Sequence, residues 1–130
     1  MTTPQQFLES FLQEKTEAWA KARPHLSAVH SRYFGEPLSK HAEYFMPTAT
    51  VRAVVENVKQ SNGGASAVAR ERLPTADIRK RYRLAACGDS WKIIGIDHEC
   101  FMCRGTGLSG GSRCEKCGGE GWYDCTTKMP

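Results

Sequence analysis

Apolar residues recur with helical spacing over residues 3–22, which predicts an amphipathic helix at the start of the chain. Thr3, Pro4 and Gln6 mark its beginning, because a threonine with a glutamine three positions later forms a capping box and proline suits the first helical turn. Polar side chains, Lys15 among them, are expected on the opposite face. The apolar face consists of Phe7, Leu8, Phe11, Leu12, Ala18 and Trp19.

A second helix is predicted to begin at Pro24 and to end at Gly35, where Pro37 prevents its continuation. Its apolar positions follow one another at helical intervals. They are Leu26, Val29, His30 and Tyr33.

The pattern changes to that of strands from about residue 48, where valine becomes frequent. Asn62-Gly63 and Gly88-Asp89 are turn signals, and each is expected to join two strands into a hairpin. The predicted strands cover residues 50–60, 65–72, 78–87 and 90–98.

The second hairpin has the clearer register, and its predicted pairs share one apolar face. They are Ala86 with Trp91, Leu84 with Ile93, and Tyr82 with Gly95. The other face is expected to carry Arg79, Arg81 and Arg83 opposite Ile96 and Ile94.

Two N-terminal helices packed on a curved, mainly antiparallel sheet make an α+β fold. Over residues 4–98 the chain resembles the nuclear transport factor 2-like (SnoaL-like) fold. The resemblance rests on the amphipathic first helix, on the aromatic pair Tyr33 and Phe34, and on the late hairpin with Gly-Asp-Ser-Trp-Lys-Ile-Ile-Gly-Ile. It implies a cone-like sheet that wraps a long helix and leaves a pocket between them.

The composition changes near residue 98, because five of the six cysteines follow it, together with many glycines. We therefore divide the chain into a main domain, residues 1–98, and a cysteine- and glycine-rich tail, residues 99–130. A small zinc-knuckle hairpin is expected in the tail.

Within the tail, the pattern C-x-x-C-x-G-x-G occurs twice with a period of 14 residues. A C-x-x-C turn presents two sulfurs on one side of a tight knuckle, and two opposed knuckles complete a tetrahedron around Zn²⁺. The glycines allow positive φ and bring backbone N–H groups close to the thiolates. The pattern predicts one structural zinc ion, bound by Cys100, Cys103, Cys114 and Cys117.

The paired motif resembles the cysteine-rich zinc-binding region of DnaJ-type chaperones, which carries four such repeats and binds two metals. From Cys100 to Gly121 this chain has two repeats, so the resemblance implies half of that region and one ion. The His-Pro-Asp signature of the J-domain is absent from the sequence, so only the mode of metal binding is carried over.

Two disulfides and a redox-active C-x-x-C are the alternatives to a zinc site. Residues 1–15 lack a secretory signal, which disfavours disulfides and predicts a cytoplasmic location. Thioredoxin-like motifs begin a helix, whereas the glycines here favour a knuckle. Cys87 is expected to pack as a small apolar residue, Cys125 has the wrong spacing for a ligand, and His98 is expected beside the site. Four bound cysteines leave no open position, so the site is expected to be structural.

A pocket enzyme of the SnoaL type would need an acid or a base between helix and sheet. The candidate pocket residues are His30, Tyr33 and Asp97, and no paired carboxylates or Ser-His-Asp arrangement accompanies them. A buried core position is the simpler interpretation of His30. The sequence therefore favours a protein without catalytic activity.

Arg79, Arg81 and Arg83 form a candidate basic contact face. The net charge is only +4 and no stacking aromatics are interleaved with these arginines. A solvated sheet face, or a face that meets an acidic protein surface, is therefore favoured over nucleic-acid binding. No apolar run approaches the roughly 20 residues that a membrane-spanning helix needs.

Together these features favour a zinc-containing, non-catalytic module that binds an unidentified protein. Two alternatives remain: a small-ligand-binding or SnoaL-like pocket enzyme, and a bacterial toxin-immunity protein, which the fold resemblance also allows. A homodimer through the late hairpin is expected. The last strand is expected to continue directly into the first knuckle, with Phe101 and Trp122 as apolar contacts between tail and main domain.

Overall fold

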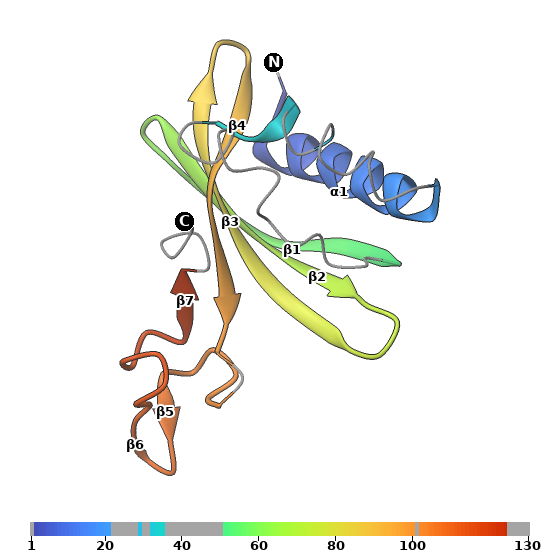
Figure 1. Cartoon of the computed structure of the whole chain (residues 1–130). Helices are drawn as coiled ribbons and strands as arrows, with labels where there is room; N and C mark the ends of the chain where they lie inside the picture. The colour runs from blue at the N-terminus through green and yellow to red at the C-terminus, as the bar shows by residue number, and fades with distance from the viewer. Residues whose placement is uncertain (1, 22–28, 30–31, 36–50, 101, 125–130) are drawn as a thin grey trace.

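The computed structural model describes residues 2–21, 29, 32–35, 51–100 and 102–124 (Figure 1). In this part of the chain, helix α1 (Pro4–Lys21) lies beside a twisted sheet. The strands are β1 (Arg52–Ser61), β2 (Gly64–Arg72), β3 (Asp77–Cys87), β4 (Ser90–Glu99), β5 (Leu108–Ser109), β6 (Ser112–Arg113) and β7 (Trp122–Asp124). The main sheet is antiparallel with the order β1-β2-β3-β4-β7, and β5 pairs with β6 in a small second sheet.

The prediction of two N-terminal helices is wrong, because α1 is the only complete helix among the described residues. Helical backbone also occurs at Val29, Arg32 and Tyr33, but Phe34 already forms a parallel bridge with Ile93 of β4. The segment therefore pairs with the sheet at the point where the second helix was expected to finish. No described helix has the length and apolar character needed to cross a membrane.

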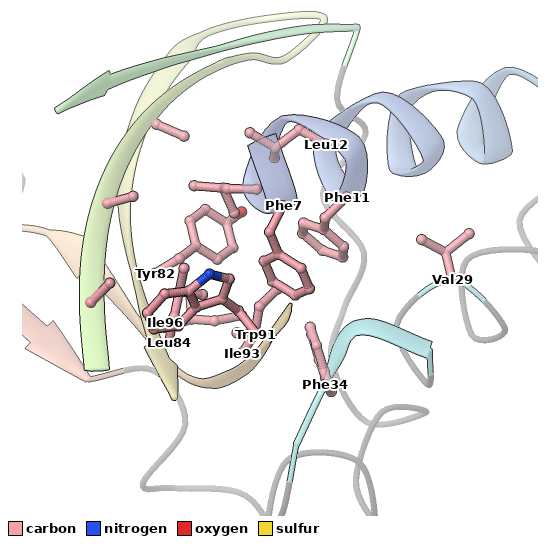
Figure 2. Packing of buried hydrophobic residues seen from close by; sticks show 14 of the residues in the cluster. Phe7, Phe11, Leu12, Val29, Phe34, Tyr82, Leu84, Trp91, Ile93 and Ile96 are labelled. Carbon is pink, nitrogen blue, oxygen red and sulfur yellow. The ribbon is translucent and has the colours of Figure 1, made fainter. Parts of the chain in front are cut away.

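The hydrophobic core lies between α1 and one face of the main sheet, which we call the inner face (Figure 2). Phe11 of α1 is fully buried, and its ring centroid lies 5.9 Å from that of Tyr82 on β3. The inner positions of β2 are small, so the rings of the helix can approach the sheet closely. These positions are Ala65, Ala67 and Ala69.

The register of the β3–β4 hairpin agrees with the prediction near the turn and departs from it further away. The two pairs nearest the turn are confirmed, but Tyr82 pairs with Ile96 instead of Gly95. A bulge at Ile94 adds one residue to β4, so that Ile93 and Ile96 are both buried while Ile94 is 37% exposed. The prediction that Ile94 and Ile96 lie opposite the arginines is therefore wrong.

Helix α1 begins as predicted but buries one residue that was expected outside. Thr3 donates its N–H to Oε1 of Gln6, and Gln6 donates its N–H to Oγ1 of Thr3, both at 3.1 Å. Lys15, in contrast, is only 3% exposed and lies on the sheet side of the helix, where its Nζ donates to Oε1 of Glu71 at 2.8 Å. The assignment of Lys15 to the polar face is wrong, because its ammonium group forms an ion pair with the buried carboxylate of Glu71 on β2.

Glu71 is fully buried on the inner face and forms the centre of a charged cluster. Its Oε2 lies 3.6 Å from Nζ of Lys80 and accepts a 2.6 Å hydrogen bond from the hydroxyl of Tyr82. Burial would raise the pKa of Glu71, but the charges of Lys15 and Lys80 outweigh burial and lower the pKa to about 2. His98 pairs with Lys80 across the strands, and burial, with the Lys80 charge, lowers its pKa.

Candidate metal centre and basic groove

Four cysteine sulfurs of the tail converge within 4.8 Å of one another. Cys100 follows β4, Cys114 follows β6, and their sulfurs lie 3.8 Å apart. The sulfurs of Cys103 and Cys117 lie 3.6 Å apart. A tetrahedral ion with metal–sulfur bonds of about 2.3 Å has sulfur–sulfur edges of about 3.8 Å. The donor set and its spacing therefore fit one tetrahedral metal ion.

Each knuckle donates a backbone amide to its second cysteine. The N–H of Gly107 lies 3.3 Å from the sulfur of Cys103, and the N–H of Gly121 lies 3.2 Å from the sulfur of Cys117. Both glycines have positive φ, 79° and 83°, which glycine adopts without a steric penalty. The expectation that the motif glycines bring N–H groups to the sulfurs is confirmed.

The two knuckles hold each other through reciprocal backbone bonds. Cys100 donates its N–H to the carbonyl of Gly121 at 2.9 Å, and Cys114 donates its N–H to the carbonyl of Gly107 at 2.8 Å. The first cysteine of each repeat is therefore tied to the last glycine of the other. A Cβ at Gly121 would lie 2.5 Å from the carbonyl oxygen of Gly105, so this close approach also requires glycine.

The surroundings shift the pKa values of the two cysteines in the first knuckle in opposite directions. Burial raises the pKa of Cys100 to about 11. Burial also opposes ionisation of Cys103, but the N–H of Gly107 and the hydrogen bond from Cys117 outweigh it and lower the pKa of Cys103 to about 6. The lowered pKa of Cys103 favours the thiolate, which is the form that binds metal.

The tail returns to the main sheet as β7, which pairs with the end of β4. Trp122 lies opposite Glu99, and its ring centroid is 5.1 Å from the guanidinium carbon of Arg81 and 5.9 Å from that of Arg79. The expected contact of Trp122 with the main domain is present, but the groups that it meets are guanidinium groups and not the apolar side chains that were expected. Phe101, the other expected contact, lies outside the described residues.

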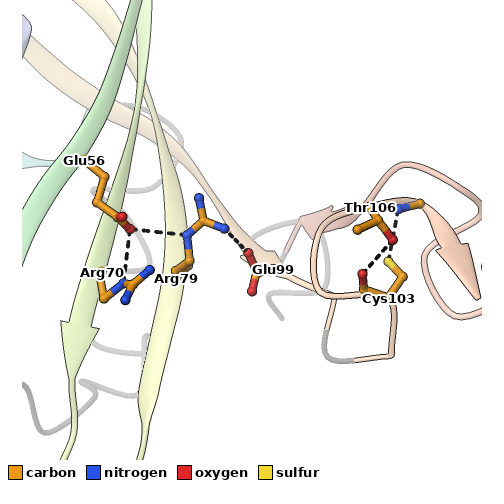
Figure 3. A network of polar contacts seen from close by, with 7 residues as sticks. Glu56, Arg70, Arg79, Glu99, Cys103 and Thr106 are labelled. Atoms are coloured by element: carbon orange, nitrogen blue, oxygen red, sulfur yellow. Dashed lines mark hydrogen bonds and ion pairs between the residues drawn. The ribbon is translucent and has the colours of Figure 1, made fainter.

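Carboxylates fix the arginines on the second face of the sheet, which we call the outer face (Figure 3). Glu56 lies 3.3 Å from Nε of Arg79 and 3.4 Å from Nε of Arg70. Glu99 accepts a 2.6 Å hydrogen bond from the other side of the Arg79 guanidinium. Arg79 is therefore held between β1 and the end of β4.

Asp97 also belongs to the outer face, because the bulge places it opposite Arg81. It is 3% exposed and lies 2.8 Å from Nε of Arg81 and 3.3 Å from Nε of Arg83. Asp97 thus supports the arginines and does not point between helix and sheet, where a SnoaL-like pocket would need it.

A groove of about 390 Å³ lies between the outer face and the first knuckle. Its cationic residues come from three separate segments: β1, β3 and the knuckle. Among the described residues, no carboxylate lines it, and Trp122 contributes its aromatic ring. The cationic residues are Lys59, Arg79, Arg81 and Arg104.

Tyr33 is a core residue in this structure. Its ring packs against Phe7 and Phe11 with centroid distances of 5.3 and 5.4 Å, and its hydroxyl donates to the carboxylate of Glu14. Burial, and then the neighbouring Glu14, raises the pKa of Tyr33 to about 12. The hydroxyl therefore stays protonated at neutral pH and is a poor base.

The remaining sequence candidates do not extend the site. His30 and Cys125 lie outside the described residues. Cys87 is exposed at the end of β3, so the expectation that it packs as a small apolar residue is wrong. His98 is not among the grouped metal donors. A second groove, of about 540 Å³ between α1 and β1, is lined by Glu9 and Glu17, and none of the candidate pocket residues of the sequence analysis is among its described lining residues.

Comparisons with protein-family models, with curated proteins and with solved structures gave no match. The resemblances to the nuclear transport factor 2-like fold and to the DnaJ-type zinc region therefore stay predictions. Sequence reasoning did not connect Arg104 or Trp122 with the basic face. A usable signal was present for Arg104, since the second repeat has Gly118 at that position.

Proposed function

We propose that the protein is a non-catalytic binding module in which one structural zinc ion fixes the tail against the basic face of the sheet. The closed cluster of four cysteines carries this proposal. Four sulfur donors match the preference of structural zinc, and they leave no coordination position for water or substrate. The ion would then act on folding rather than as a Lewis acid.

The surroundings of the metal centre support a role in protein binding. The knuckle is tied to the sheet by β7, so the groove between them has walls from two parts of the chain. Arginine and tryptophan, which are enriched at protein interfaces, face this groove. A homodimer through the late hairpin stays a prediction, which light scattering would test.

Native mass spectrometry of the purified protein tests the zinc site. We expect one zinc ion for each chain. Cys103→Ser should lose it, whereas Cys87→Ser should retain it, because Cys87 is exposed and lies outside the cluster. Circular dichroism should show that Cys103→Ser keeps the main sheet. No bound metal, two ions, or iron in place of zinc would contradict the proposal.

A further inference from the structure

The groove beside the metal centre has the properties of a binding site for an acidic protein segment. We propose that a short acidic segment of a partner protein binds there, with its carboxylates on Lys59 and Arg104 and an apolar side chain on Trp122. The inference rests on the proposed binding function and names its ligand class. Its basis is the charge, backbone conformation and chemistry of these residues.

The charges of the groove are unevenly neutralised. Arg79 is shared by Glu56 and Glu99, and Oδ2 of Asp97 pairs with both Arg81 and Arg83. Lys59 and Arg104 have no carboxylate partner among the residues that the structure describes. Within the described part of the chain, the groove therefore has one cation without a carboxylate partner on each wall.

Arg104 occupies a backbone conformation that favours glycine. Its φ is 51°, and it is the only non-glycine with positive φ in the described part of the chain. The equivalent position of the second knuckle is Gly118, with φ 69°. A side chain at this position is unfavourable for the backbone, and strain of this kind concentrates at functional sites. The side chain of Arg104 lines the groove. Ligand binding by this side chain would explain why the position holds arginine in spite of its unfavourable backbone conformation.

The remaining lining suits an extended polypeptide. Trp122 offers an aromatic surface with guanidinium groups close to its ring, and Val68 adds an apolar patch on the sheet. Ser66, Asn57 and Thr106 supply hydrogen-bonding groups around them. A peptide that alternates acidic and apolar side chains would place one kind on the cations and the other on Trp122.

A nucleic acid fits the same groove less well. Proteins that bind nucleic acid commonly neutralise about six to ten phosphates with a continuous basic surface. Here Glu56 and Glu99 already pair with Arg79, and Asp97 pairs with Arg81, so the groove does not offer a continuous basic surface to a phosphate backbone. A partner with few, discrete carboxylates matches two free cations better.

Fluorescence anisotropy with three labelled probes tests the inference on the zinc-loaded protein. The probes are a peptide of alternating glutamate and leucine, the same peptide with glutamine for glutamate, and an oligothymidine of equal charge. We expect the glutamate peptide to bind most tightly, and its affinity to fall as salt is raised. Equal binding of both peptides, or no binding, would overturn the inference, and tighter binding of the oligothymidine would replace it with a nucleic-acid site.

Three variants locate the binding. Arg104→Gly should weaken the glutamate peptide about tenfold, as expected for one charge-assisted contact, and it relieves the backbone at the same time. Lys59 belongs to β1 and not to the knuckle, and Lys59→Gln should weaken binding of the glutamate peptide similarly. Arg72→Ala is the matched control, because Arg72 is exposed, pairs with Asp77 and does not line the groove.

Equal effects of all three variants would show non-specific attraction to net charge and would overturn the inference. The zinc content of each variant is measured by native mass spectrometry in parallel. A protein that holds zinc but does not distinguish the peptides contradicts only this inference. A protein without zinc contradicts the proposed function.

Discussion

Arg104 and Gly118 occupy equivalent positions in the two knuckles, and both have left-handed backbone, with φ of 51° and 69°. Only one of the two residues suits that conformation. The backbone penalty for a residue with a Cβ is about 1 kcal/mol or slightly more. The first knuckle is therefore less stable than it would be with glycine at position 104, as the second knuckle has at position 118.

Arg104→Gly should accordingly stabilise the zinc-loaded protein by about 1 kcal/mol, because it removes the penalty at this position. Urea unfolding followed by circular dichroism measures the change. Gly118→Ala is the converse variant and should destabilise by a similar amount. A loss of stability in Arg104→Gly would show that the arginine makes a contact worth more than the backbone penalty.

Gly121→Ala should prevent the two knuckles from closing. A Cβ at Gly121 would meet the carbonyl of Gly105 at 2.5 Å, and the residue also donates its N–H to the sulfur of Cys117. Gly110→Ala is the matched control, because Gly110 has positive φ as well but no atom within 4 Å of an added Cβ. We expect zinc affinity, measured by competition with a chelator, to fall at least about tenfold in Gly121→Ala, since the change disturbs backbone and sulfur together. Equal affinities of the two variants would contradict the close approach.

Ile93→Ala and Ile94→Ala compare the bulge residue Ile94 with its buried neighbour Ile93. Ile93 is fully buried and Ile94 is 37% exposed. The first substitution should cost about 3 kcal/mol of unfolding free energy and the second less than about 1 kcal/mol. Urea unfolding distinguishes them. Similar costs for both would contradict the difference in burial between the two positions.

Glu71→Gln should destabilise the protein by about 3 kcal/mol at neutral pH, because the two lysines around Glu71 would lose their buried counter-charge. The contribution of Glu71 to the unfolding free energy of the wild-type protein depends on pH. The pKa of Glu71 is lowered from 4.5 to about 2 by folding, so its contribution is complete above pH 4.5 and is lost as the pH falls toward 2. The difference in unfolding free energy between wild type and variant should shrink over this range, and a constant difference would contradict the assignment.

Features that depend on neighbouring residues could be predicted from the sequence. The cysteine cluster follows from a spacing of three residues repeated once, and the hairpin pairs next to Gly88-Asp89 follow from the turn. The capping box of α1 is equally local. In each case the residues that contact one another are also close together in the sequence, so the sequence motif contains the whole contact.

Features that depend on residues far apart in the sequence could not be predicted from it. The bulge at Ile94 exists because both Ile93 and Ile96 are buried, and strict alternation allows only one of them on the inner face. Lys15 was assigned to the solvent although it follows Leu12 by three positions on the apolar side, because its partner Glu71 lies 56 residues away. The bridge between Phe34 and Ile93 of β4 is a further contact between residues far apart in the sequence, and it lies at the expected end of the second helix.

The strands β4 and β7 enclose the metal-binding loop at its base, because the N–H of Cys100 bonds the carbonyl of Gly121 where the two strands meet. The four sulfurs therefore act as a chelate whose effective concentration is raised by strand pairing. On the proposed zinc site, ion binding and the pairing of β7 with β4 would stabilise each other, because the same backbone bond closes the loop that holds the sulfurs. The proposed ion would thereby keep Trp122 of β7 beside the arginines of the sheet.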